Sequence, residues 1–93
     1  MTPPIERPSP DALIALAVQY ATQMLSDELA PYDAGKLIWR ECQLALPEDD
    51  HRLDPFVYWV SEREETAELS RLALCDHALR TAAATLIETG SAI

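Results

Sequence analysis

The side chains that could bind a metal ion are few in this chain, and their spacing is poor. The chain has two cysteines and two histidines, and the candidate ligands are Cys42, His51, Cys75, Asp76 and His77. Residues 75–77 are consecutive, but adjacent helical residues point about 100° apart and do not converge on one ion. We therefore expect no metal site, with His51 in a loop and His77 exposed or half-buried on a helix.

Covalent catalysis would need a cysteine or serine held against a base in a cleft. Both cysteines lie within apolar helical patterns, and neither histidine has an orienting partner nearby in the sequence. Glu64 and Glu68 stand one helical turn apart, yet acid–base catalysis needs an enclosed pocket, and a charged run on a helix usually faces solvent. The only glycines, Gly35 and Gly90, cannot make a phosphate-binding loop. We predict a protein that is not an enzyme and uses no cofactor.

A combination of carboxylates and aromatic side chains gives the sharper functional hypothesis. Acidic side chains that surround an aromatic anchor speed the encounter with a basic protein, and the anchor supplies affinity. The alternative is a solvated acidic surface with the aromatic residues in the core. The candidate partner-binding residues are Glu48, Asp49, Asp50, Tyr58, Trp59, Glu62, Glu64 and Glu65.

The composition favours the same kind of partner. The 93 residues include 16 Asp and Glu against 7 Lys and Arg, a formal net charge of -9, which disfavours nucleic acid and anionic membranes as direct partners. No apolar stretch is long enough to span a bilayer, and the first ten residues do not resemble a secretion signal. We expect a cytoplasmic protein whose two cysteines are buried free thiols rather than a disulfide.

The residue pattern in the first half of the chain predicts two helices after a flexible arm. Prolines at positions 3, 4 and 8 favour an extended arm over residues 1–8, followed by one helical domain over residues 9–90. Ser9 can cap a helix that Pro10 opens and that runs over residues 10–27. Asp33 can cap a second helix that ends at Leu46, with an apolar stripe of Gly35, Ile38, Trp39, Cys42, Ala45 and Leu46.

The residue pattern in the second half of the chain predicts two further helices after a polar loop over residues 47–54. Asp54 can cap a third helix that Pro55 opens, and residues 56–60 of that helix are apolar on every side. Either two neighbouring helices cover this block, or part of it, with Tyr58 and Trp59 as the candidates, lies at the surface as an interface anchor. Thr66 can cap the last helix, and a single continuous helix is the alternative. The expected core positions of that last helix are Leu69, Leu72, Cys75, Leu79, Ala82 or Ala83, and Leu86.

Two segments carry a resemblance to a known group of proteins. The segment YATQMLSDELAPYDAGKLIW, and after the acidic loop DPFVYWVSEREE, resemble small helical bacterial proteins that include immunity proteins of toxin systems. The matching positions are Pro31, Gly35, Trp39, Ser61 and Glu62, and the likeness covers about half of the chain. The resemblance implies a non-enzymatic inhibitor that binds one cognate toxin.

The sequence as a whole predicts an all-α fold, a compact antiparallel bundle of about four helices with the last helix across the first two. Its expected function is protein binding through an acidic surface that carries aromatic residues, with a basic protein, such as a cognate bacterial toxin, as the partner. The alternative is a homo-oligomeric structural or regulatory module, because residues 56–60 and the broad apolar face of the first helix could pair two copies.

Overall fold

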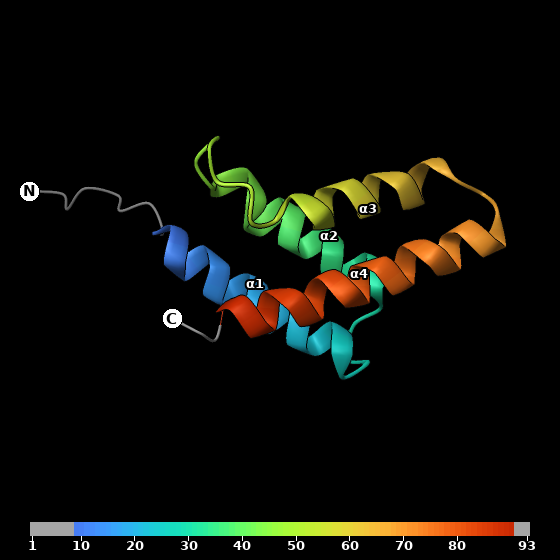
Figure 1. The fold of residues 1–93 in the computed structure, drawn as a ribbon, viewed down its shortest axis with the longest axis horizontal. Helices are drawn as coiled ribbons and strands as arrows, with labels where there is room; N and C mark the ends of the chain where they lie inside the picture. Colours follow the sequence, from blue (N-terminus) through green and yellow to red (C-terminus); the bar gives the residue numbers. More distant parts are fainter. Residues whose placement is uncertain (1–8, 91–93) are drawn as a thin grey trace, which may run out of the picture.

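The computed structural model describes residues 9–90, so the predicted flexible arm lies outside the described residues, as do residues 91–93. The described chain is all-α, as predicted, and contains no strand. Consecutive helices reverse direction to make an antiparallel bundle (Figure 1). The elements are α1 (Pro10–Leu25), α2 (Pro31–Glu41), the 3₁₀ turn η1 (Gln43–Ala45), α3 (Asp54–Glu65) and α4 (Leu69–Gly90).

Proline opens three of the four helices, because its fixed φ suits the first helical turn and its missing N–H is not needed there. The predicted cap of α1 is confirmed: the Ala12 N–H donates to Ser9 Oγ at 3.2 Å. The predicted cap of α2 is wrong, since Ala30 holds the cap position and Asp33 lies inside the first turn. Asp54 is likewise the first residue of α3 rather than its cap.

The second helix ends five residues earlier than predicted. After Glu41 the backbone tightens into η1, in which the Leu46 N–H donates to the Gln43 carbonyl at 3.1 Å. A 3₁₀ turn advances more degrees per residue than an α-helix, so the register of the apolar stripe changes. Cys42 and Leu46 are buried as expected, but Ala45 is exposed and Leu44 is 72% exposed.

The break between the third and fourth helices is real, but its details differ from the prediction. Thr66 is the C-cap of α3 rather than the cap of α4, and its hydroxyl accepts from the Glu68 N–H at 3.3 Å. Leu69, a predicted core residue, is 83% exposed. The reason is its position, because the start of α4 lies beside α3 alone and projects beyond α1 and α2 (Figure 1).

The core is built from all four helices, and both thiols lie in it as free cysteines. α4 packs mainly on α1 and α3 and more lightly on α2. α2 approaches its neighbours closely at Gly35, where a Cβ would stand 2.8 Å from Val60 Cγ2 and 3.2 Å from Leu79 Cδ2. Trp39, a predicted core position, is half-buried at the edge of this packing.

α1 ends two residues before the predicted Asp27. Asp27 adopts a left-handed φ of 62°, which turns the chain away from the helix. Arg80 of α4 fixes this turn, since its guanidinium donates to the Met24 carbonyl at 3.1 Å and to Asp27 at 2.7 Å. One long side chain therefore satisfies a carbonyl of the last turn of α1 and ties the α1–α2 connection to α4.

Candidate functional site

Tyr58 and Trp59 are neighbours in the chain but face different sides of α3. Their rings meet edge to face, with centroids 4.9 Å apart and planes at 82°. Tyr58 is 55% exposed, whereas Trp59 is half-buried and packs against the core. Consecutive residues of a helix project about 100° apart, which explains the difference. Tyr58 is therefore available to a partner, and Trp59 has one part in the core and another part exposed to solvent.

Tyr58 borders a hollow of about 670 Å³ between η1 and α3, which we call the Tyr58 hollow. The 3₁₀ turn turns Leu44 outward beside Tyr58, so two exposed apolar side chains lie at one place. Glu48 and Asp54 supply carboxylates at the same hollow. Its principal lining residues are Trp39, Leu44, Glu48, Asp54, Val57 and Tyr58.

The carboxylates of the loop over residues 47–53 have different roles. Glu48 and Asp49 are exposed, and neither forms an ion pair within residues 9–90. Asp50 instead accepts two bonds from Arg52 Nε, at 3.0 and 3.2 Å, and one from Nη2 at 2.6 Å. These hydrogen bonds from Arg52 lower the pKa of Asp50. Asp50 therefore shapes the loop, and Glu48 and Asp49 carry the charge that a partner can meet.

The second predicted acidic cluster lies at the far end of α3. Glu62 pairs with Arg71 at 2.5 Å, and Glu64 pairs with Lys36 at 3.0 Å. The hydrogen bond from Lys36 lowers the pKa of Glu64. Glu65 is exposed and has no ion-pair partner among the described residues.

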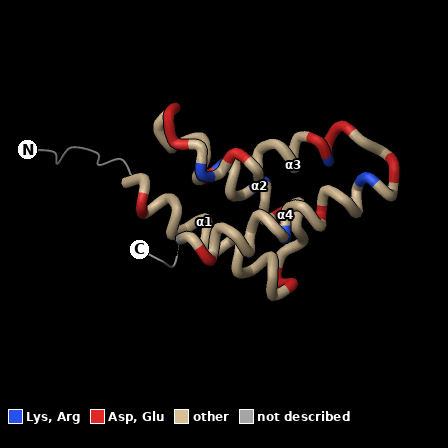
Figure 2. Tube along the Cα trace, viewed as in Figure 1, with Lys and Arg blue, Asp and Glu red and all other residues tan. Residues whose placement is uncertain are grey.

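The eight predicted residues do not form one continuous surface. Figure 2 shows acidic residues at both ends of α3, and a helix of 12 residues separates those ends by about 18 Å. The structure brings Glu48 and Tyr58 together and leaves Glu62, Glu64 and Glu65 at a distance. Trp59 faces a separate groove.

That groove lies between α3 and α4, and we call it the α3–α4 groove. Its volume is about 730 Å³, and its apolar residues include Ile14, Phe56, Trp59, Ala82 and Leu86. Exposed threonines of α4 line it as well, at positions 81, 85 and 89. Sequence reasoning missed this groove, although the four-residue spacing of these threonines was a visible signal for one continuous helix face.

Leu44 and Asp54 are the other residues that sequence reasoning missed. Asp54 was assigned to a helix cap, but its carboxylate accepts from Gln43 Nε2 at 3.4 Å and lies 2.9 Å from His51 Nδ1. These contacts hold the carboxylate at the Tyr58 hollow. No sequence signal identifies Leu44, because its exposure depends on the 3₁₀ turn.

Contrary to the prediction, His51 has an orienting partner, because the Asp54 carboxylate lies 2.9 Å from its Nδ1 atom. Within residues 9–90 no group of three His, Cys, Asp or Glu side chains is placed to hold a metal ion. Burial, followed by the charge of Glu41, raises the pKa of the Cys42 thiol to about 11, so this thiol is protonated at neutral pH and is a poor nucleophile.

None of the described helices is both long enough and apolar enough to cross a membrane. Comparison with protein-family models, curated proteins and solved structures finds no match to this chain.

Proposed function

We propose that this chain is a non-enzymatic, cytoplasmic protein-binding domain that holds a basic partner protein at the Tyr58 hollow. The observation that supports the proposal is the pairing of exposed apolar side chains, Leu44 and Tyr58, with the carboxylates of Glu48 and Asp54. No lysine or arginine lies among the described residues that line the hollow. An apolar side chain flanked by lysine or arginine complements this arrangement.

The apolar part of the hollow can supply affinity. Full burial of a side chain such as leucine stabilises a complex by about 1.5 to 3 kcal/mol, and tyrosine is among the commonest residues that dominate binding energy. Tyr58 also gains from its edge-to-face contact with Trp59, which limits the conformations of the ring before binding. The anchor is therefore partly ordered in advance.

The distribution of charge favours a basic partner. Of the six described lysines and arginines, five form ion pairs with acidic residues of the same chain, and Arg40 does not. Glu48 and Asp49 have no such partner among the described residues, so a cation from outside meets no internal competitor there. Exposed carboxylates of this kind increase the association rate with a positively charged protein.

The finer proposal is an immunity-type inhibitor that masks a basic bacterial toxin. It rests on the resemblance at Pro31, Gly35, Trp39, Ser61 and Glu62. Trp39 lines the Tyr58 hollow, which connects the resembling segment to the proposed binding surface. An inhibitor of this kind needs only a surface complementary to its toxin.

A homo-oligomeric module is the second candidate. The observation that favours it is the projecting start of α4, where Leu69 is 83% exposed and Leu74 is 49% exposed. Two copies could bury these leucines against each other. Such self-association would persist at high salt, whereas an acidic–basic complex would weaken.

The test is capture of partners from native lysate by the tagged chain at low and high salt, with identification by mass spectrometry. We expect one basic protein that is lost as salt rises. Tyr58→Ala should lower its affinity at least about tenfold with little change in Tm, because the side chain is exposed. The matched control is Leu69→Ala, which removes an exposed apolar side chain elsewhere.

Two outcomes would overturn the proposal. Retention of only the chain's own untagged copy, lost in Leu69→Ala, would favour the oligomeric module. Undiminished capture by Tyr58→Ala, with loss in Trp59→Ala at unchanged Tm, would move the binding surface to the other side of α3.

A further inference from the structure

The α3–α4 groove has the dimensions of a helix-binding site. Its α4 wall runs from His77 to Thr89, which is three helical turns or about 18 Å. The partly buried side chains of Trp59, Ala78 and Ala82 provide apolar surface along it, above the buried side chains of Phe56 and Leu86. Grooves of this kind receive the apolar face of an amphipathic helix, whose side chains at i, i+3 or i+4, and i+7 enter the groove.

Most polar side chains that line the groove already form hydrogen bonds, and His77 is the exception. The hydroxyls of Thr81, Thr85 and Thr89 donate to the carbonyls of His77, Thr81 and Thr85, at 3.1, 3.1 and 3.0 Å. The guanidinium of Arg52 is already bonded to Asp50 through Nε and Nη2. Because these donors are in use, apolar side chains are the better occupants of the wall.

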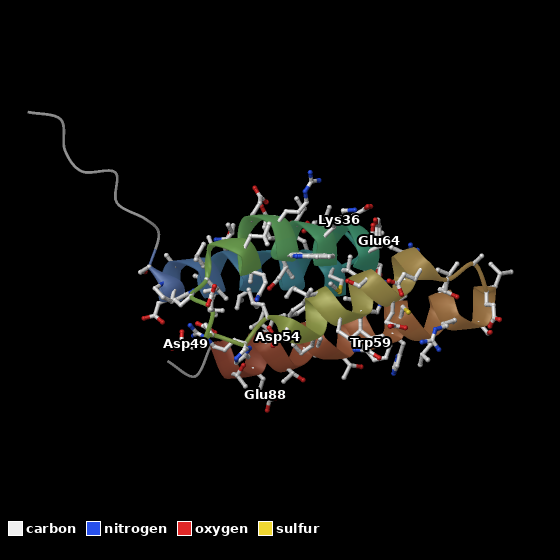
Figure 3. The ribbon with its side chains drawn as sticks, turned by 90° about the horizontal axis from the view of Figure 1, so that it is seen from above. Lys36, Asp49, Asp54, Trp59, Glu64 and Glu88 are labelled. Atoms are coloured by element: carbon white, nitrogen blue, oxygen red, sulfur yellow. The ribbon has the colours of Figure 1, made fainter. Side chains whose placement is uncertain are left out.

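The charge around the groove differs between its two ends. At one end Arg52 lies 2.6 Å from Asp50 and 3.9 Å from Asp11, so this cation is already balanced by carboxylates. Glu88, which adjoins the lining residue Thr89, lies at this same end (Figure 3), whereas the Asp54 carboxylate is held at the Tyr58 hollow. The three carboxylates of Asp11, Asp50 and Glu88 against one guanidinium make this end negative.

The other end of the groove is close to neutral. Asp76, next to His77, is paired with Arg63 at 2.8 Å, and Glu62 is paired with Arg71. A helix bound in the groove therefore has its basic side chains attracted to one end of the groove only. Such a gradient favours one direction of binding, since a helix N-terminus and basic side chains are both stabilised next to carboxylates.

We propose that the α3–α4 groove binds one amphipathic helix of a partner protein, with basic residues of that helix at the Glu88 end of the groove. This inference rests on the proposed function only in taking the partner to be a protein. The groove and the Tyr58 hollow lie on different sides of α3, so each can fail without the other. A second copy of this chain is disfavoured as the occupant, because each copy carries a net charge of -9.

The test selects binders for the full chain from a displayed library of helical peptides of about 12 to 15 residues, with random side chains on one face. We expect enriched peptides with an apolar stripe at helical spacing and lysine or arginine at one end. Trp39→Phe leaves Trp59 as the single tryptophan, so its emission should shift to shorter wavelength as an enriched peptide fills the groove.

Matched variants locate the bound peptide. Thr85→Lys places a long charged side chain on the groove wall and should weaken binding at least about tenfold, whereas Ala84→Lys makes the same charge change at an exposed α4 position outside the lining. Glu88→Gln should weaken binding more than Glu28→Gln, which removes a carboxylate from the α1–α2 connection. Leu44→Ala, which changes the Tyr58 hollow at a residue outside the groove lining, should leave peptide binding unchanged.

The proposal is overturned if no peptide is enriched, or if the enriched peptides lack the helical stripe or the basic end. Equal effects of Thr85→Lys and Ala84→Lys would place the peptide elsewhere. Sedimentation that shows a dimer disrupted by Thr85→Lys would identify a second copy as the occupant.

Discussion

Two weakly acidic side chains, Cys42 and Tyr20, hold their protons more tightly in the folded chain than ordinary cysteine and tyrosine do. Burial, and then the charge of Glu41, raises the pKa of Cys42 to about 11. The hydrogen bond that the Tyr20 hydroxyl donates to Glu41, followed by burial, raises the pKa of Tyr20 to about 12. One surface carboxylate therefore influences two residues on different elements.

These shifts predict that the chain loses stability in alkaline solution. Between about pH 9 and about pH 11 the unfolded chain releases the Cys42 proton and the folded chain keeps it, so the free energy of unfolding falls as pH rises. A difference of two pKa units corresponds to at most about 2 to 3 kcal/mol. Tyr20 adds a loss in the same direction above about pH 10.

Urea unfolding at a series of pH values measures this loss. Cys42→Ala should reduce the fall in the free energy of unfolding between about pH 9 and about pH 11. Tyr20→Phe should reduce the fall above about pH 10. A free energy of unfolding that stays constant to about pH 11 in the original chain would contradict the prediction.

The helices differ in how well their first turns are capped. Ser9 accepts a hydrogen bond from the backbone at the start of α1, whereas Ala30 at the start of α2 has no side-chain group to do so. Ala30 is exposed, and its backbone (φ -63°, ψ 148°) has the extended conformation that capping residues adopt. The start of α2 therefore leaves a stabilising interaction unused.

Ala30→Ser should stabilise the chain by about 0.5 to 1 kcal/mol, because a serine hydroxyl can accept from an N–H of the first turn. Ser9→Ala is the matched opposite change and should cost about 1 kcal/mol. Chemical denaturation of both variants measures the change in the free energy of unfolding that each substitution causes. A destabilised Ala30→Ser would show that this backbone cannot use a cap.

Local signals account for the elements that the sequence predicts correctly. Ser9 and Pro10 act within one turn, and Leu13, Ala17 and Met24 are buried because they share one face of an uninterrupted helix. Leu69 obeys the same spacing but is exposed, because burial depends on which helices lie opposite. Periodicity along one helix contains no information about where its neighbours end.

The candidate site depends on such non-local features. Glu48 and Tyr58 were predicted, but their meeting place exists because the chain leaves the α-helix at Cys42 and turns Leu44 outward. Pro47 led to the prediction that α2 ends at Leu46, but a proline does not show that the helix ends earlier, at Glu41. The split between Tyr58 and Trp59 could be anticipated from the helical angle, although which of the two is exposed could not.

At the scale of the whole molecule, charge is the dominant feature. The chain carries a formal net charge of -9, and its described cations are mostly engaged in surface ion pairs. Each exposed ion pair contributes about 0 to 1 kcal/mol, whereas the excess carboxylates repel one another over longer distances. Repulsion among the unpaired acids therefore opposes the folded state at low ionic strength.

Added salt should accordingly stabilise the chain. Between about 0.01 M and 0.15 M salt the Debye length falls from about 30 Å to about 8 Å, which screens the long-range repulsion more than the contacts within ion pairs. A gain of about 1 kcal/mol would raise Tm by about 4 to 8 °C. Thermal unfolding at both salt concentrations measures this change, and Glu65→Gln should respond less. A lower Tm at high salt would show that the ion pairs dominate.

The start of α4, which lies beside α3 alone, has a consequence for the order in which the molecule opens. Its first turns can separate from α3 without exposing the core residues of the C-terminal half of α4, such as Ala83 and Leu86. The free energy of such an opening is smaller than that of global unfolding. Backbone amides of these first turns should therefore exchange their hydrogens with solvent while those of the C-terminal half of α4 stay protected.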